Sequence, residues 1–160
     1  MRLYLTILVF FLATSASASK YAATVINAKT GEILFSDAPD KRLHPAGLTK
    51  LMTLYVVFEA VENSEVDLDE KVLVSRRAAS EPPVKMGLNY NQNVRLRYLI
   101  RAAGVHGSND ASTALAESIE GSEAAFARRM NRTAKAMGMN RTTFKNAHGL
   151  TEPGHLSTAR

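Results

Sequence analysis

The sequence contains no cysteine, which excludes disulfide bonds, thiolate metal sites and cysteine nucleophiles. A chain without disulfides depends on the packing of its core for stability. If it is exported, this composition fits a bacterial envelope protein better than a small extracellular domain from a higher organism. A catalytic site in this chain cannot rest on a thiol.

Long apolar runs are also scarce, and the most pronounced one lies at the N-terminus. Arg2 precedes an apolar stretch at residues 3–13, and small residues at 16–18 provide a signal-peptidase cleavage site. This pattern predicts a signal peptide at residues 1–18 and a mature domain at residues 19–160. An uncleaved membrane anchor is the alternative, but the run is short for a membrane span. We expect export across the inner membrane to the periplasm or cell envelope.

Clusters of one charge sign and metal-binding spacings are missing as well. The formal net charge is +5, the charge signs alternate along most of the chain, and no Lys/Arg-rich run contains interleaved aromatics. Nucleic acid is therefore not an expected partner. No His-x-x-x-His or adjacent carboxylate pattern appears, and the four histidines are too scattered for a metal motif: His44, His106, His148 and His155. We expect no metal and no cofactor.

Hydrophobic periodicity and turn residues predict that the chain begins with a β-hairpin and continues mainly as helices. Two short strands at residues 21–26 and 32–35 flank a turn at residues 27–31. An excursion of about thirty residues follows at 62–93, with a short strand at 71–75, and this length suggests a loop that lines a site. The rest of the chain is expected to hold helices at residues 94–103, 109–119 and 123–137 and a turn-rich loop at 145–160.

Two expectations concern the surface and the core around the last of these helices. Arginines on one side of the helix should form a solvated face: Arg128, Arg129 and Arg132. Methionines should act as core filler, because an unbranched thioether fits irregular gaps: Met130, Met137 and Met139.

A predicted helix at residues 46–61 gives the first indication of chemistry. Its apolar residues surround the helix rather than forming one stripe, which predicts burial on most sides. Lys50 nevertheless lies in the first turn, and a buried amine is costly unless it is paired or used. Lys50 is therefore a candidate site residue.

Several segments resemble the D-alanyl-D-alanine carboxypeptidases, which are the low-molecular-mass penicillin-binding proteins. Residues 45–53 read Pro-Ala-Gly-Leu-Thr-Lys-Leu-Met-Thr, which is similar to the family signature Pro-Ala-Ser-x-Thr-Lys-Leu-Met-Thr. Residues 109–112 resemble the end of its Ser-x-Asn-Asp-Ala segment, and residues 146–150 and 154–160 also look like the family. The resemblance covers essentially the whole mature chain, with the signatures in the family's order.

The resemblance implies the fold of serine β-lactamases and transpeptidases, an α/β (α+β) sandwich of a five-stranded antiparallel sheet and a helical cluster. This chain would hold the N-terminal hairpin and most of the helices, with the later strands missing. In the family, a serine attacks a peptide carbonyl, a lysine three residues on takes its proton, and an acyl-enzyme forms. The implied substrates are peptidoglycan stem peptides ending in D-Ala-D-Ala, and β-lactams trap the intermediate.

The residues carried over by this resemblance depart from the family pattern at both serines. Gly47 stands at the position of the nucleophile, Lys50 at that of the general base, and Gly107 at that of the second-motif serine. Asn109 matches the asparagine that orients substrate. Ser108 could present its hydroxyl to substrate from a shifted loop, and the alternative is that it caps the following helix.

Neither Thr49 nor the Lys-Thr-Gly at residues 29–31 replaces a group that is missing from the site. Thr49 lies well round the helix from the face shared by positions 47 and 50. The family's third motif is Lys-Thr-Gly, and residues 29–31 have these letters, but they lie in the opening hairpin turn. The true motif is expected after the segment at residues 155–159, and we expect it to be missing.

The loss of a nucleophile decides what activity to expect. Removing it from a covalent hydrolase costs on the order of a millionfold in rate. We therefore expect a catalytically impaired chain that binds β-lactams at most non-covalently. Two alternatives stay open: a non-catalytic pseudoenzyme that binds stem peptides through Lys50, Asn109 and the cleft, or an inactivated variant of a longer working enzyme.

Overall fold

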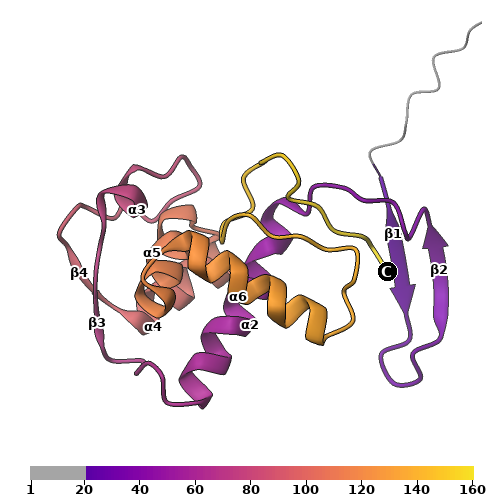
Figure 1. Cartoon of the computed structure of the whole chain (residues 1–160), viewed down its shortest axis with the longest axis horizontal. Coiled ribbons are helices and arrows are strands. Elements are labelled where there is room, and N and C mark those ends of the chain that lie inside the picture. Colours follow the sequence, from indigo (N-terminus) through magenta and orange to yellow (C-terminus); the bar gives the residue numbers. More distant parts are fainter. Residues whose placement is uncertain (1–20) are drawn as a thin grey trace, which may run out of the picture.

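The computed structural model describes residues 21–160, and the signal peptide predicted at residues 1–18 lies outside the described residues. The described chain has two regions, a β-hairpin and a helical body, and the C-terminal segment runs between them to end near the hairpin (Figure 1). Within residues 21–160, no helix is both long and apolar enough to cross a bilayer.

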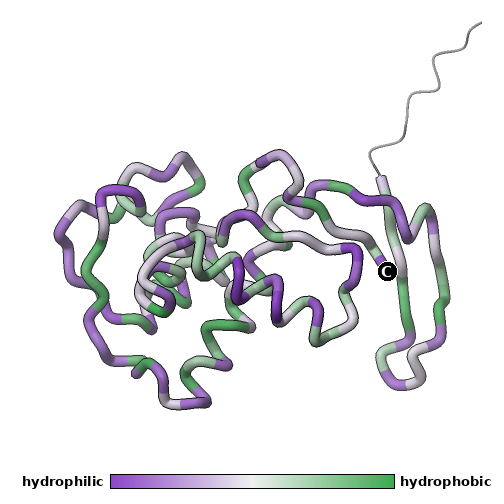
Figure 2. Tube along the Cα trace, in the orientation of Figure 1, coloured by the Kyte–Doolittle hydropathy of each residue, from purple (hydrophilic) through white to green (hydrophobic). Residues whose placement is uncertain are grey.

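The hairpin confirms the sequence prediction. Strand β1 (Ala23–Ile26) pairs antiparallel with β2 (Ile33–Asp37). The side chain of Asn27 accepts the backbone N–H of Lys29, and Gly31 has a positive φ of 75°, which a tight turn requires. No residue of either strand is buried. Figure 2 shows apolar residues along both strands of this exposed ribbon.

Helix α2 (Thr49–Glu62) follows a short 3-10 turn, η2 (Ala46–Leu48), and packs against the two longer helices that come later in the chain. One face of α2 is buried in the body. The opposite face carries large apolar side chains that stay about half exposed or more: Leu51, Tyr55 and Phe58. The prediction of burial on most sides is therefore wrong for the described residues, because no helix or strand covers this face. An apolar groove of about 560 Å³ runs along it.

The helical body begins with short elements, three of which differ from the prediction. Strand β3 (Lys71–Leu73) pairs antiparallel with β4 (Asn93–Arg95), so β4 occupies the predicted start of a helix at residue 94. Helix α4 (Leu96–Arg101) starts only after this strand and continues as a π-helical turn, Ala102–His106. Between the strands lies an unpredicted helix, α3 (Arg76–Ser80), which the Ser75 hydroxyl caps by accepting the N–H of Ala78.

The longer helices α5 (Asn109–Glu120) and α6 (Glu123–Ala136) confirm the predicted ones at nearly the predicted bounds. Helix α5 packs against α2, α3, α4 and α6, and eight successive residues from Asn109 onward are buried. The core contains these fully buried apolar side chains: Val56, Val57, Val74, Leu96, Leu99, Leu115, Phe126 and Met130. This core fixes the positions of α2 and α5, which meet beside the candidate site.

The expectations about the arginines of α6 and about the methionines on and after this helix are each confirmed only in part. Arg128 and Arg132 are exposed, as predicted. Arg129 is not solvated: its side chain is 13% exposed and forms ion pairs with Glu59, Glu65 and Glu120. Salt links to three carboxylates raise the pKa of the Arg129 guanidinium. Among the methionines expected in the core, Met130 is fully buried, whereas Met137 is 45% exposed.

Residues 145–160 form the turn-rich loop predicted for the C-terminal part, after a connection at residues 137–144. Isolated antiparallel bridges join Leu43 to Ser157 and Thr143 to Leu156. Residues 146–150 pass over the N-terminal part of α2, and the Thr53 hydroxyl of this helix donates to the carbonyl of Ala147 at 2.7 Å. The fold thus places a C-terminal loop directly on the helix that carries Lys50.

Candidate active site

A cleft of about 530 Å³ brings together most of the residues singled out in the sequence. Its lining includes the start of α2, the π-helical turn before α5 and the loop at residues 148–150. Four of the five predicted site residues line it: Gly47, Lys50, Gly107 and Asn109. Val84 also lines the cleft, which confirms that the excursion at residues 62–93 contributes to a site.

Lys50 is the polar centre of this cleft. The residue is only 8% exposed, and its Nζ atom donates to Asn109 Oδ1 at 2.9 Å and to the backbone carbonyl oxygen of His148 at 2.6 Å. Burial lowers the pKa of the Lys50 amine, because the charged form loses solvation. A lysine of this kind can exchange a proton more readily than one on the surface.

Asn109 is held from several sides. As the first residue of α5, it donates from its backbone N–H to the carbonyl of Val84 at 2.7 Å, and from Nδ2 to the carbonyl of Pro82 at 3.0 Å. The neighbouring carboxylate of Asp110 accepts three backbone N–H groups at 2.9–3.0 Å, from Met86, Gly87 and Leu88. These bonds tie the excursion to α5 and leave Oδ1 of Asn109 directed to Lys50.

Position 47 faces open space. A Cβ atom added to Gly47 meets no atom within 4 Å, and its backbone lies outside the left-handed region, so a side chain would fit there. Thr49 is fully buried, and its hydroxyl lies 2.9 Å from Nε2 of His155. Its side chain therefore points away from the cleft, as the helical spacing predicts.

Gly107 ends the π-helical turn with a left-handed φ of 74°, a conformation that favours glycine. Ser108 occupies the N-cap position of α5, as one of the two expectations had it, but its side chain forms no cap hydrogen bond. The residue is fully buried and is not among those that line the cleft. Its hydroxyl has no hydrogen-bond partner among the described residues.

The loop at residues 146–150 closes one side of the cleft, and glycine is required within it. A Cβ atom on Gly149 would lie 1.9 Å from the carbonyl oxygen of Ala46, so only glycine permits this approach to the η2 turn. Asn146 closes the loop by accepting the N–H of Gly149 at 2.7 Å and donating to the carbonyl of Leu150 at 3.0 Å. The carbonyl of His148 is thereby presented to Lys50.

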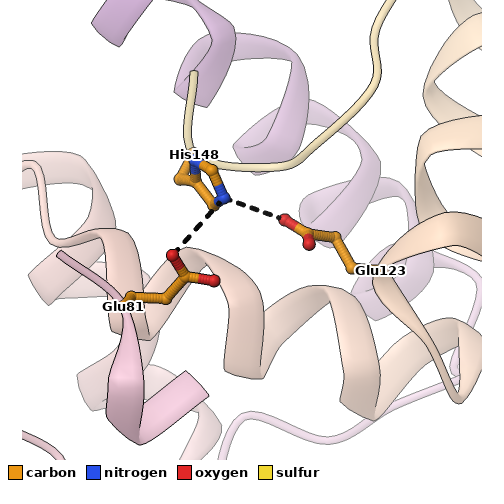
Figure 3. A group of neighbouring side chains, drawn as sticks. All are labelled: Glu81, Glu123 and His148. Atoms are coloured by element: carbon orange, nitrogen blue, oxygen red, sulfur yellow. Dashed lines mark ion pairs between the residues drawn. The ribbon is translucent and has the colours of Figure 1, made fainter. Parts of the chain in front are cut away.

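Sequence reasoning missed a buried cluster behind this loop. Figure 3 shows the carboxylates of Glu81 and Glu123 directed toward the ring of His148. The Nε2 atom of His148 lies 3.3 Å from Glu123 Oε1 and 3.6 Å from Glu81 Oε2. These residues come from three distant parts of the chain, so no local spacing could have revealed them. The three offer ligand atoms within 4.8 Å of one another, although the sequence suggested no metal motif.

The family model for D-alanyl-D-alanine carboxypeptidase matches residues 11–160. D-alanyl-D-alanine carboxypeptidase DacF from Bacillus subtilis is 37% identical over 138 residues, which are 86% of this chain and 36% of the relative. The chain thus spans about a third of the length of this curated relative.

Solved structures agree with the sequence match. The carboxypeptidase DacD from Francisella tularensis superposes with a TM-score of 0.83 at 38% identity, over 86% of this chain and 33% of that structure. Penicillin-binding protein D2 from Listeria monocytogenes, in its ampicillin-bound form, gives a TM-score of 0.76 at 35% identity, over 86% of this chain and 56% of that structure. The α/β fold of penicillin-binding proteins predicted from the sequence is confirmed. Because the family model matches residues 11–160 of this chain, the chain belongs to the D-alanyl-D-alanine carboxypeptidase family.

Proposed function

We propose that the cleft around Lys50 binds peptidoglycan stem peptides ending in D-Ala-D-Ala, and that this chain does not form an acyl-enzyme with them. The observation that carries the proposal is the pairing of Lys50 and Asn109 at 2.9 Å beside Gly47, which has no side chain to attack a carbonyl. Family membership supplies the substrate class, because the relatives are D-alanyl-D-alanine carboxypeptidases.

The chemistry of the proposal follows from what remains in the cleft. In a serine–lysine pair, the lysine takes the proton of the serine hydroxyl as that oxygen attacks the substrate carbonyl. Here Lys50 has no hydroxyl at position 47, so its amine can only hold or orient a bound peptide. Gly107 likewise offers no hydroxyl for a proton path. The loss of covalent catalysis is expected to cost on the order of a millionfold in rate.

Intact-protein mass spectrometry after incubation with ampicillin tests the claim that no acyl-enzyme forms. The natural chain should gain no covalent mass, and a stable adduct on it would overturn the proposal. Gly47→Ser and Gly47→Ala form a matched pair, since both add a Cβ in the open space at this position but only serine adds a nucleophile. An adduct on the serine variant alone would identify the missing hydroxyl as the limiting defect.

The other half of the proposal, the binding of stem peptides, makes the chain a non-catalytic binding module. It is favoured by the retained Lys50–Asn109 bond and by the open cleft of about 530 Å³ beside it. Titration with a stem peptide ending in D-Ala-D-Ala should shift NMR resonances of cleft residues, and Lys50→Met should weaken this binding. A peptide ending in L-Ala-L-Ala is the control. No saturable shift at millimolar peptide would eliminate the binding module.

Localisation in the cell envelope is also part of the proposal. It rests on family membership and on the predicted signal peptide at residues 1–18. N-terminal sequencing of the protein from a periplasmic fraction should give a chain that begins at Ser19. Retention of Met1 in a cytosolic fraction would contradict the prediction.

A further inference from the structure

The position of the Lys50 amine depends on a loop carbonyl. One of its two hydrogen-bond acceptors is the side chain of Asn109, which the rigid start of α5 holds, but the other is the backbone oxygen of His148 at 2.6 Å. A backbone carbonyl in a loop is only as well placed as the groups that anchor the loop. The anchors of His148 are therefore part of the environment of Lys50.

Glu123 provides two of those anchors. Its Oε1 atom accepts the backbone N–H of Ala147 at 3.0 Å and lies 3.3 Å from Nε2 of His148. Its other oxygen pairs with the guanidinium of Arg77, which fixes the carboxylate from the opposite side. The side chain of Glu123 is only 2% exposed, so water does not compete strongly for these contacts.

Glu81 completes the cluster from another element. Its carboxylate lies 3.6 Å from Nε2 of His148 and accepts the hydroxyl of Thr113 at 3.0 Å, which joins the cluster to α5. The cluster thus links α5, α6 and the segment after α3 to the same histidine ring. Three packed elements of the body determine where the loop lies over Lys50.

The hydrogen bonds around His148 define what the cluster does. The backbone N–H of Leu150 donates to Nδ1 at 3.1 Å, so Nδ1 bears the lone pair and Nε2 bears the proton in the neutral ring. The Nε2–H group therefore faces the carboxylates of Glu123 and Glu81, at 3.3 and 3.6 Å. A divalent cation would need the Nε2 lone pair, which this tautomer does not offer. The arrangement fits an anchor for the ring rather than a metal centre.

We propose that Glu123, assisted by Glu81, is a positioning residue for Lys50 that acts through the His148 ring and the backbone of residues 147–148. Neither carboxylate is placed to touch a bound peptide, because neither lines the cleft. Burial lowers the pKa of His148 most, Glu123 and Glu81 raise it, and the charge of Lys50 lowers it further. Electrostatic interactions through the His148 ring therefore connect the two carboxylates with Lys50. The proposal extends the description of the site and does not depend on turnover.

The titration of Lys50 tests the proposal directly. NMR of protein containing lysine labelled with ¹³C at Cε, assigned with Lys50→Met, reports the pKa of this amine in the full chain. In Glu123→Ala the backbone N–H of Ala147 loses its acceptor and the His148 ring loses its nearest carboxylate. The loop should then move off Lys50 and admit water. Because burial is what lowers the pKa of the Lys50 amine, this pKa should shift upward toward the ordinary lysine value. Glu123→Gln keeps an acceptor oxygen and should largely preserve the parent titration.

A control separates positioning from general destabilisation. Arg129→Met, on the same helix α6, breaks the ion pairs with Glu59, Glu65 and Glu120 and should lower stability without changing the titration of Lys50. A folded Glu123→Ala protein in which the Lys50 titration is unchanged would overturn the proposal. If that variant does not fold, Glu123→Asp decides: its shorter side chain should displace the Lys50 titration in the same direction, and an unchanged titration would refute positioning. Because the readout involves no peptide or β-lactam, it stands apart from the outcome of the binding and acylation tests.

Discussion

The hairpin and the helical body are both built from apolar sequence, yet they use it in opposite ways. In the body, apolar residues from α2, α4, α5 and α6 form one buried core. In the hairpin, the apolar residues of β1 and β2 remain at least half exposed: Val25, Ile26, Ile33, Leu34 and Phe35. Consecutive apolar residues on a strand point to opposite faces, so both faces of this ribbon are apolar.

This contrast separates the formation of an element from its stabilisation. The turn at residues 27–31 is sufficient to define the hairpin, because its hydrogen bonds are local. A two-stranded ribbon without a covered face is marginally stable in water. The body carries the stability and the candidate site, whereas the hairpin presents two uncovered apolar faces, which are an aggregation risk.

A matched pair of phenylalanine truncations should show the largest difference between the two regions. Phe126→Ala removes a fully buried ring from the core and should lower the free energy of unfolding by about 3–5 kcal/mol. Phe35→Ala removes a ring that is 50% exposed and should change it by less than about 0.5 kcal/mol. Urea denaturation followed by circular dichroism measures both.

The same two variants also test whether the hairpin is independent of the buried core. Equal losses for Phe126→Ala and Phe35→Ala would mean that the hairpin belongs to the cooperative core in solution. Lower aggregation of Phe35→Ala at high protein concentration, measured by light scattering, would instead support the view that the exposed apolar faces of the hairpin are adhesive.

An intermediate effect is expected from pH, and it should be confined to the body. Burial lowers the pKa of both His148 and His155 below the ordinary value of 6.5. The backbone N–H of Leu150 donates to Nδ1 of His148, and that of Lys145 donates to Nδ1 of His155. Protonation of either Nδ1 atom would place two N–H donors opposite each other and break the hydrogen bond. The unfolded chain therefore binds more protons than the native chain once the pH falls below about 6.5. Stability is fully present above that pH and is lost as the pH decreases.

The slope cannot exceed about 1.4 kcal/mol per pH unit for each histidine. Urea denaturation between pH 7.5 and pH 5 should give this dependence, and His155→Gln should reduce it. His106→Gln is the matched control, because this ring is exposed at the cleft mouth. Hydrogen exchange should show the loss in α2 and α5 and not in β1 and β2. A pH-independent free energy of unfolding would contradict the prediction.

Much of this fold was predictable because its elements are local. Helices α5 and α6 follow from apolar periodicity and from the residues that precede them, and the hairpin follows from its turn. Strand β4 was misassigned because Val94 fits either a strand or the start of a helix, and its pairing with Val72 decides the matter. Helix α3 has only five residues, too few to show a period.

The candidate site was predictable only where the family motifs mark it. Lys50 stood out as a lysine in an apolar helix, Asn109 and the two glycines were assigned by the resemblance to the family motifs, and the cleft contains all four. The His148 carbonyl and its anchor Glu123 had no sequence signal, since a backbone oxygen belongs to every residue and the two positions meet only in the fold. Arg129 was misplaced for the same reason, because its partners Glu59 and Glu65 come from the end of α2 and the loop after it.

The smallest effect is expected at the junction between the two regions. Arg160 donates to both carboxylate oxygens of Asp40, at 2.6 and 2.8 Å, and this pair links the chain that follows the hairpin to the C-terminal segment. The Arg160 guanidinium lowers the pKa of the Asp40 carboxyl, but both groups are in water, where solvent and salt screen the attraction. Asp40→Asn should therefore leave the melting temperature nearly unchanged, and 1 M salt should act equally on parent and variant. A marked, salt-sensitive decrease in the variant would show that hairpin and body are coupled through this junction, and the two regions would then have to be treated as one cooperative unit.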